Sequence, residues 1–109
     1  MLGGEKMNIE RTTSGRIELS LSRDPDRFIS LAEAIRKKFA GRWTQQLDGL
    51  DQSYWDLDVQ GKEITVHREH YLGVIVYCDD DTLGRMLLEQ LQHDLASLLQ
   101  FTHPVDRGR

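Results

Sequence analysis

The amino-acid sequence predicts an α+β domain, a two-layer sandwich in which two helices pack on one face of an antiparallel sheet. Three patterns lead to this prediction. Short segments alternate apolar and polar residues, which is typical of half-buried strands. Two longer segments repeat apolar residues every three or four positions, as amphipathic helices do. Turn dipeptides separate the strand-like segments. The expected order is two strands, a helix, three or four strands and a second helix, or ββ-α-βββ(β)-α.

Length and composition indicate one globular unit, because 109 residues with 39% hydrophobic and 29% charged residues suit one modest core. We expect residues 1–6 to be a disordered N-terminal segment, residues 7–103 a single α+β domain and residues 104–109 a flexible C-terminal tail. The single cysteine excludes an internal disulfide framework. We expect a cytoplasmic protein, because no apolar run could cross a membrane and no secretory signal is recognisable.

The first third of the chain predicts a hairpin followed by a helix. Residues 7–11 and 17–22 alternate in polarity around a turn cluster at residues 13–15. Asp24-Pro25 then supplies a carboxylate N-cap and a proline for the first helical position. The apolar stripe of the helix consists of Phe28, Leu31, Ala32, Ile35 and Phe39. Gly41 is expected to end the helix in the left-handed C-cap conformation.

The middle of the chain predicts a strand meander. Residues 54–59 and 64–67 alternate in polarity and are joined by Gln60-Gly61, which is short enough for a tight hairpin. Residues 74–78 form a nearly continuous β-branched run, which is typical of a central strand. Residues 43–47 give a fourth strand if they also pair.

A second helix is expected after the three aspartates at residues 79–81. Its apolar stripe includes Leu83, Leu87, Leu91, Leu95 and Leu98, and Pro104 ends it. Carboxylates ahead of a helix cap its free N–H groups, so we interpret the three aspartates as capping residues. Clustered carboxylates can also hold Mg²⁺ or Ca²⁺, but the spacing and central glycine of a calcium loop are missing.

Charge is unevenly distributed along the chain. Residues 1–46 hold nine Lys or Arg and six Asp or Glu, whereas the remainder holds five and twelve. An acidic surface repels phosphate backbones, so we expect no nucleic-acid partner. The cluster formed by Arg36, Lys37, Lys38 and Arg42 does not change this view, because cations at a helix C-terminus complement the helix dipole. The acidic part favours a protein partner with a basic surface.

The leading candidate site is the polar face of the predicted sheet. Tyr54, Asp56 and Asp58 alternate with the core-facing Trp55 and Leu57. His67 is expected to share this face. Tyrosine is a frequent interface anchor, and aspartates around it steer a basic partner. We therefore predict a partner-binding surface at Tyr54, Asp56, Asp58 and His67, with no cofactor.

A metal-dependent hydrolase is the alternative, with a site built from His67, Glu69, His70 and Asp79. Imidazole and carboxylate are ligands that zinc accepts. On a strand, however, His67 and His70 point to opposite faces because their offset is odd. Cys78 is not expected to be a catalytic nucleophile, since three neighbouring aspartates disfavour the thiolate.

A resemblance adds to this interpretation. The segments Tyr54-Trp55-Asp56-Leu57-Asp58-Val59 and His67-Arg68-Glu69-His70-Tyr71-Leu72-Gly73 resemble those of small uncharacterised bacterial proteins. Some of these are similar to immunity proteins, which neutralise toxins by binding them. The resemblance implies a small cytosolic binding protein, and together with the acidic face it predicts a non-enzymatic protein-binding module. A homodimer that pairs an exposed sheet edge or the polar face, with a ligand at the joint, is a further alternative.

Overall fold

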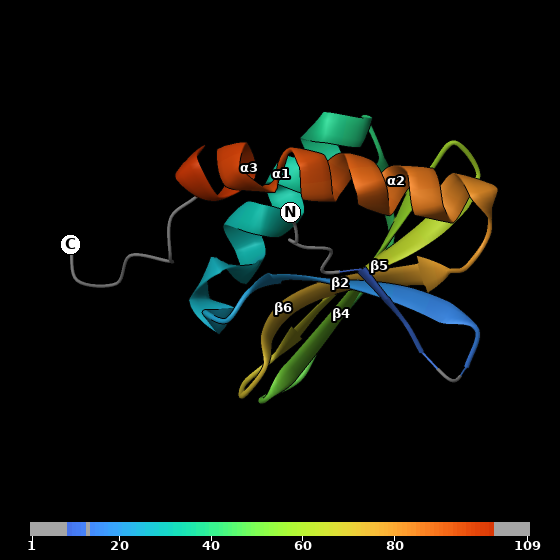
Figure 1. Ribbon diagram of the computed structural model, residues 1–109. Coiled ribbons are helices and arrows are strands. Elements are labelled where there is room, and N and C mark those ends of the chain that lie inside the picture. The colour runs from blue at the N-terminus through green and yellow to red at the C-terminus, as the bar shows by residue number, and fades with distance from the viewer. Residues whose placement is uncertain (1–8, 13, 102–109) are drawn as a thin grey trace.

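The computed structural model describes residues 9–12 and 14–101, with the side chain of residue 101 excepted. It contains a sheet and three α-helices (Figure 1). The strands are β1 (Ile9–Arg11), β2 (Arg16–Ser22), β3 (Arg42–Asp48), β4 (Gln52–Val59), β5 (Lys62–Glu69) and β6 (Gly73–Asp79). The helices are the short 3₁₀ helix η1 (Pro25–Arg27), α1 (Phe28–Phe39), α2 (Thr82–His93) and α3 (Leu95–Phe101). The terminal segments predicted as disordered or flexible, residues 1–6 and 104–109, lie outside the described residues.

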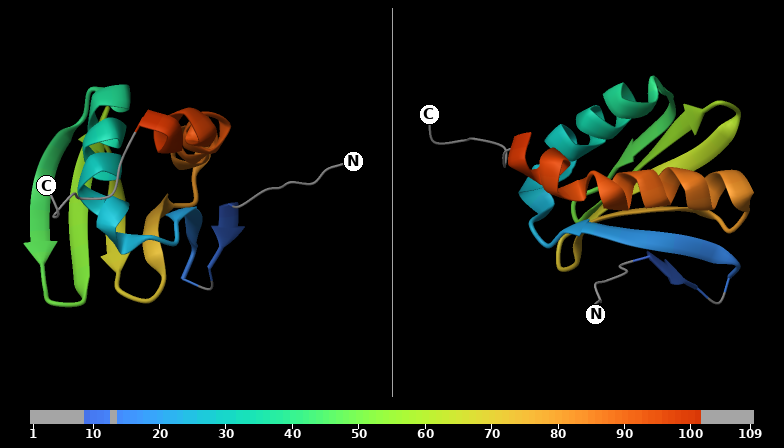
Figure 2. Two further views of the ribbon diagram at one scale, coloured as in Figure 1. Left: turned by 90° about the vertical axis from the view of Figure 1, so that its left-hand side faces the viewer. Right: turned by 45° about the horizontal axis from the view of Figure 1, so that its top comes forward.

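All six strands form one antiparallel sheet in the order β1-β2-β6-β5-β4-β3. The α+β class and the antiparallel sheet are therefore confirmed. The segment 43–47 does pair, as part of β3, so the meander has four strands. β1 and β3 lie at opposite edges of the sheet (Figure 2). Among the strands that the structure describes, only the pairing of β2 with β6 joins segments far apart in the sequence.

One face of the sheet and the helices share a single core. Figure 1 shows α1, α2 and α3 gathered on the upper side of the strands. The strands contribute Ile17, Leu19, Leu21, Leu57, Val59, Ile64, Val66, Val74, Val76 and Cys78 to the core. The helices contribute Phe28, Leu31, Ala32, Ile35, Leu87, Leu88 and Leu91. The alternation predicted from the sequence decides which strand residues are buried, because successive side chains point to opposite faces. None of the helices in the described ranges is long and apolar enough to span a membrane.

The beginning of the first helix differs from its prediction. Asp24 does act as a cap, since its side chain accepts a hydrogen bond from the N–H of Asp26 (3.0 Å), but the turn that it caps is η1. α1 follows from Phe28. The proline therefore occupies the first position of a tighter turn that leads into the helix.

The end of the first helix also differs. Ala40, not Gly41, adopts the left-handed conformation, with φ at 52°. Gly41 is needed for another reason. A Cβ at this position would lie 2.8 Å from Leu57 Cγ and 3.0 Å from the carbonyl oxygen of Asp58. Its role is to allow close approach of the chain to β4.

The second predicted helix is divided in two. α2 ends at His93 and α3 begins at Leu95, with Asp94 between them outside helical geometry. The Asp94 carboxylate forms an ion pair with Lys38 of α1. The leucine stripe continues across the break, because Leu95 and Leu98 still pack against the core.

Candidate functional site

The face of the sheet opposite the core, here called the open face, holds the predicted partner-binding residues. Tyr54, Asp56 and Asp58 alternate along β4 with the buried or core-packed Trp55, Leu57 and Val59. The register places His67 opposite Tyr54, so the structure brings these two residues together. Tyr54, Asp56, Asp58 and His67 are all half-buried. The four residues therefore lie on one face, along two neighbouring strands.

An aromatic cluster lies at the centre of the open face. The rings of Tyr54 and His67 stack with centroids 4.2 Å apart and an interplanar angle of 12°. The ring of Tyr77, on β6, meets His67 edge-on at 6.2 Å. Gln52 links the first pair, since its side-chain oxygen contacts both the Tyr54 hydroxyl and His67 Nε2. Burial lowers the pKa of His67, with smaller opposing and reinforcing effects from Glu69 and Arg16. At neutral pH the imidazole of His67 is therefore uncharged.

A polar hollow of about 560 Å³ adjoins the aromatic cluster. Arg16, Tyr54, Asp56, Thr65 and Tyr77 line it. The Thr65 hydroxyl donates a hydrogen bond to Asp56 Oδ1 (2.7 Å), and the Arg16 guanidinium lies 4.3 Å from the centroid of Tyr77. Burial also raises the pKa of Tyr77. These contacts fix the side chains of the hollow, so it offers a preformed polar surface.

Negative charge dominates the open face. The strand registers place seven carboxylates on it: Glu10, Glu18, Asp56, Asp58, Glu63, Glu69 and Asp79. Two arginines, Arg16 and Arg42, share it. Four of the acids form directly opposed like-charged pairs, Glu10 with Glu18 and Asp58 with Glu63. Within the described part of the chain none of these four makes a salt bridge.

Sequence reasoning missed Tyr77, Arg16 and Glu63 as members of this surface. Tyr77 alternates with Val76 and Cys78, so period two could have placed it on the polar face. Arg16 precedes the alternating core residues Ile17 and Leu19, so period two also places it on the polar face. Its position next to Tyr77 has no local signal, because it depends on the long-range pairing of β2 with β6.

The four residues of the alternative metal site are spread over the sheet. His67 lies within β5, and Glu69 ends that strand with Oε1 accepting the N–H groups of Tyr71 and Leu72 (both 2.9 Å). His70 is an exposed turn residue. Asp79 lies at the other end of β6, opposite Arg16. In residues 9–12 and 14–101, no group of three or more His, Cys, Asp or Glu side chains could hold a metal ion.

Two of the three aspartates before α2 have structural partners. Asp81 caps α2 by accepting the N–H of Gly84 (2.8 Å) and pairs with Lys62, so its predicted capping role is confirmed. Asp80 binds Arg85 (2.6 Å) and Arg11 (2.5 Å).

Arg36, Lys37 and Lys38 lie in the last turn of α1, as the dipole argument predicts. Cys78 is buried, and burial raises the pKa of its thiol to about 11.

Comparison with protein-family models, with curated proteins and with solved structures finds no match to this chain. A functional conclusion therefore depends on the geometry and charge of the open face.

Proposed function

We propose that this chain is a non-enzymatic cytosolic protein that binds a protein partner with a basic surface through its open face. One observation supports this above all. The open face carries seven carboxylates and two arginines. In two places, two carboxylates lie directly opposite each other on neighbouring strands. Such pairs destabilise a free sheet, whereas a cationic partner would relieve the repulsion.

The proposal assumes a two-layer sandwich, in which the helices cover one face of the sheet and leave the other available. The burial pattern supports this arrangement, because the buried apolar strand residues belong to the core and Tyr54, His67 and Tyr77 are only half-buried. Protein interfaces combine aromatic anchors with a polar rim. The stacked pair of Tyr54 and His67 would be the anchor, and Asp58 and Glu63 part of the rim.

The resemblance of residues 54–59 and 67–73 to proteins similar to immunity proteins agrees in kind with this proposal. An immunity protein acts by covering a toxin, and it requires no catalytic residues. A basic toxin or another basic protein would fit the same charge pattern. The partner class is therefore defined by its positive charge.

The test uses two doubly substituted variants with the same change in net charge. Asp58→Asn with Glu63→Gln removes the opposed pair on the open face. Asp51→Asn with Glu89→Gln is the control, because Asp51 and Glu89 are exposed residues of a turn and of α2. Asp56 is left intact because it accepts the hydrogen bond of Thr65. Each variant is immobilised and used to capture proteins from a lysate of the native cell.

We expect a basic protein that the wild type and the control capture and that the Asp58/Glu63 variant captures less. Its association rate should fall most at low salt, where charges steer encounter. The Asp58/Glu63 variant should also unfold at slightly higher urea, by about 0.5 kcal/mol, since repulsion has been removed. That stability gain separates lost binding from lost folding. Equal capture by all three proteins, with equal salt dependence, would refute the proposal.

A further inference from the structure

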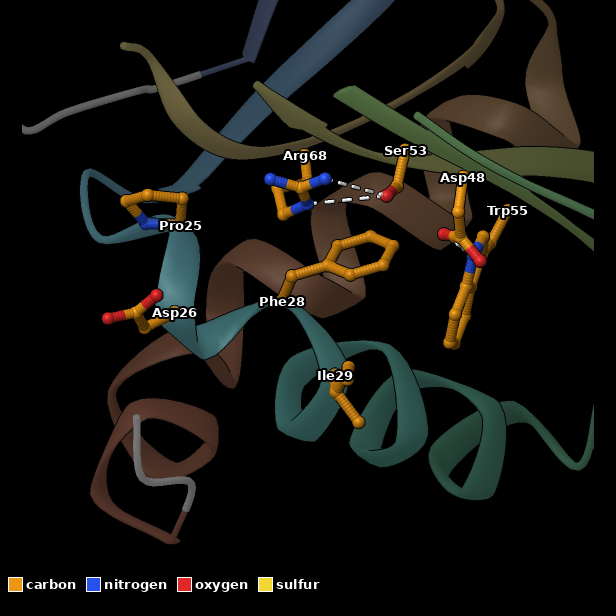
Figure 3. Close-up of a pocket in the computed structure, with 8 residues that line it drawn as sticks. All are labelled: Pro25, Asp26, Phe28, Ile29, Asp48, Ser53, Trp55 and Arg68. Carbon is orange, nitrogen blue, oxygen red and sulfur yellow. Dashed lines mark hydrogen bonds between the residues drawn. The ribbon is translucent and has the colours of Figure 1, made fainter. Parts of the chain in front are cut away.

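A second cavity lies on the helix side of the sheet, where the start of α1 meets the hairpin between β3 and β4 (Figure 3). Its volume is about 450 Å³. Its walls include Phe28, Ile29, Asp48, Ser53, Trp55 and Arg68. Ser53 is opposite Arg68 in the register, and Trp55 is opposite the core residue Val66. The sheet therefore separates this cavity from the open face.

Arg68 is the positively charged residue among those that line the cavity. Its Nε and Nη2 donate to the Ser53 hydroxyl (3.2 and 3.1 Å), and Nη2 also donates to the carbonyl of Gly49 (3.2 Å). Both acceptors are neutral. Among the residues that the structure describes, Arg68 forms no salt bridge and its Nη1 donates no hydrogen bond. A half-buried guanidinium without a counter-ion favours an anion, above all a carboxylate that matches its planar donors.

The rest of the cavity wall is largely apolar. Phe28 meets Trp55 edge-on with centroids 4.8 Å apart, and Ile29 is 54% exposed although it carries no polar group. The indole N–H of Trp55 already donates to Asp48 Oδ1 (2.9 Å), so the indole offers the cavity an apolar surface. Small-molecule sites commonly combine such walls with one or two placed polar groups, at volumes of roughly 300–1,000 Å³.

We propose that this cavity binds a small organic carboxylate whose apolar part is an aromatic or branched aliphatic group. The carboxylate accepts hydrogen bonds from Arg68, including one from Nη1, and the apolar part contacts Phe28, Ile29 and Trp55. Asp26 and Asp48 line the cavity on either side of Arg68 in Figure 3. Their charges oppose an anion, so removing the charge of Asp48 should strengthen binding.

The experiment titrates phenylacetate and indole-3-acetate, at millimolar concentrations, into the ¹⁵N-labelled protein and follows the Trp55 indole N–H by NMR. We expect saturable shifts. Phenylacetamide, which has the shape of phenylacetate without the charge, should bind about tenfold more weakly, and Arg68→Gln should weaken phenylacetate to a similar extent. Asp48→Asn keeps an oxygen for Trp55 and should bind phenylacetate more tightly.

Two further variants keep the test independent of the structural role of Arg68. Ile29→Trp fills the cavity from an exposed position and should abolish the shifts. Met86→Trp, at an exposed site that does not line this cavity, should leave them unchanged. The proposal is overturned if phenylacetamide or phenethylammonium binds as tightly as phenylacetate. It is also overturned if a folded Arg68→Gln variant binds normally, or if neither carboxylate gives a saturable shift.

Discussion

His67 combines the two properties of the open face, its aromatic packing and its charge balance. The imidazole stacks on Tyr54 at 4.2 Å and is partly withdrawn from water, which lowers its pKa below the ordinary value of 6.5. The folded chain therefore binds this proton less tightly than the unfolded chain. Because proton binding is linked to folding, the neutral His67 side chain contributes its full stabilisation of the folded state above pH 6.5. This contribution is lost as the pH falls through the lowered pKa.

We predict that His67→Gln reduces the loss of stability between about pH 7.5 and pH 5, because the variant has no imidazole to protonate at this site. Urea unfolding at several pH values measures the effect as the free energy of unfolding. His70→Gln, at an exposed turn position, is the matched control. A pH dependence unchanged by His67→Gln would contradict the lowered pKa.

Cys78 is the second residue whose chemistry follows from burial. Its pKa of about 11, against an ordinary value of 9.0, leaves about a hundredfold less thiolate at pH 8 than in the unfolded chain. Iodoacetamide reacts with the thiolate, so we predict alkylation of the folded protein at least about a hundredfold slower than in denaturant at the same pH. Mass spectrometry measures both rates. Comparable rates would show that Cys78 is not buried and that its pKa is not raised.

At the residue scale, the sequence predicts well which face of the sheet a side chain occupies, but it predicts poorly which other side chains it contacts. Alternation is enough to separate Asp56 and Asp58 from Leu57, because the period of a strand is two. It does not predict that Asp56 accepts a hydrogen bond from Thr65, or that Arg68 reaches Ser53. Those contacts depend on the register between β4 and β5, which the turn at Gln60-Gly61 sets.

At the scale of elements, local signals locate the helices but not all of their ends. The stripe from Leu83 to Leu98 is continuous, so the sequence predicts one helix where the structure has α2 and α3. The break at Asp94 coincides with its ion pair to Lys38, fifty-six positions away, which no local window contains. The tight hairpin at Gln60-Gly61 is correctly predicted. Both of its residues have positive φ, at 55° and 83°, as a two-residue turn of this kind requires.

Gly84, in the first turn of α2, gives a prediction at this scale. Alanine is favoured over glycine inside a helix by about 1 kcal/mol. At position 84, however, a Cβ would lie 2.4 Å from the carbonyl oxygen of Asp79 and 2.9 Å from Cys78 Sγ. Backbone cannot yield as a flexible side chain can, so we predict that Gly84→Ala destabilises the protein by about 1–3 kcal/mol.

The measurement is the free energy of unfolding in urea. Gln90→Ala, at an exposed position of the same helix, serves as the control and should change stability by less than about 0.5 kcal/mol. A Gly84→Ala variant as stable as wild type would show that α2 can move away from β6 at little cost.

At the scale of the whole molecule, the pairing of strands that follow one another in the sequence was predictable, but the pairing of β2 with β6 was not. β3 to β6 follow one another as hairpins, so short connections favour their order. The pairing of β2 with β6 brings together two strands that are separated in the sequence by α1 and by the first three strands of the meander. That pairing places Arg16 and Glu18 beside Tyr77, and so it determines how far the acidic open face extends. A pattern of apolar residues carries no information on this step.

The same topology leaves β3 as a seven-residue edge strand, which bears on whether the chain pairs with a second copy. An exposed regular edge invites another strand, and proteins often protect such edges with a bulge. β3 has one. Trp43 is opposite Leu57 and Gln45 is opposite Asp56, so Thr44 between them is an extra residue. We therefore expect the free wild-type chain to be monomeric, with the bulge interrupting the outward-facing groups of the edge.

Deletion of Thr44 tests this expectation, because it restores continuous alternation between Trp43 and Gln45 without changing the pairs that β3 makes with β4. The variant should self-associate through a regular edge, and its mass by light scattering should rise with concentration while that of the wild type stays constant. Thr44→Ala, which keeps the extra residue and loses only the hydroxyl that donates to the Asp56 carbonyl (3.2 Å), should remain monomeric. The expectation fails if the wild-type chain already dimerises. If Gln46→Lys, on the same edge, then disrupts that dimer, β3 is itself an interface. The open face would then have to bind its partner as part of a twofold assembly.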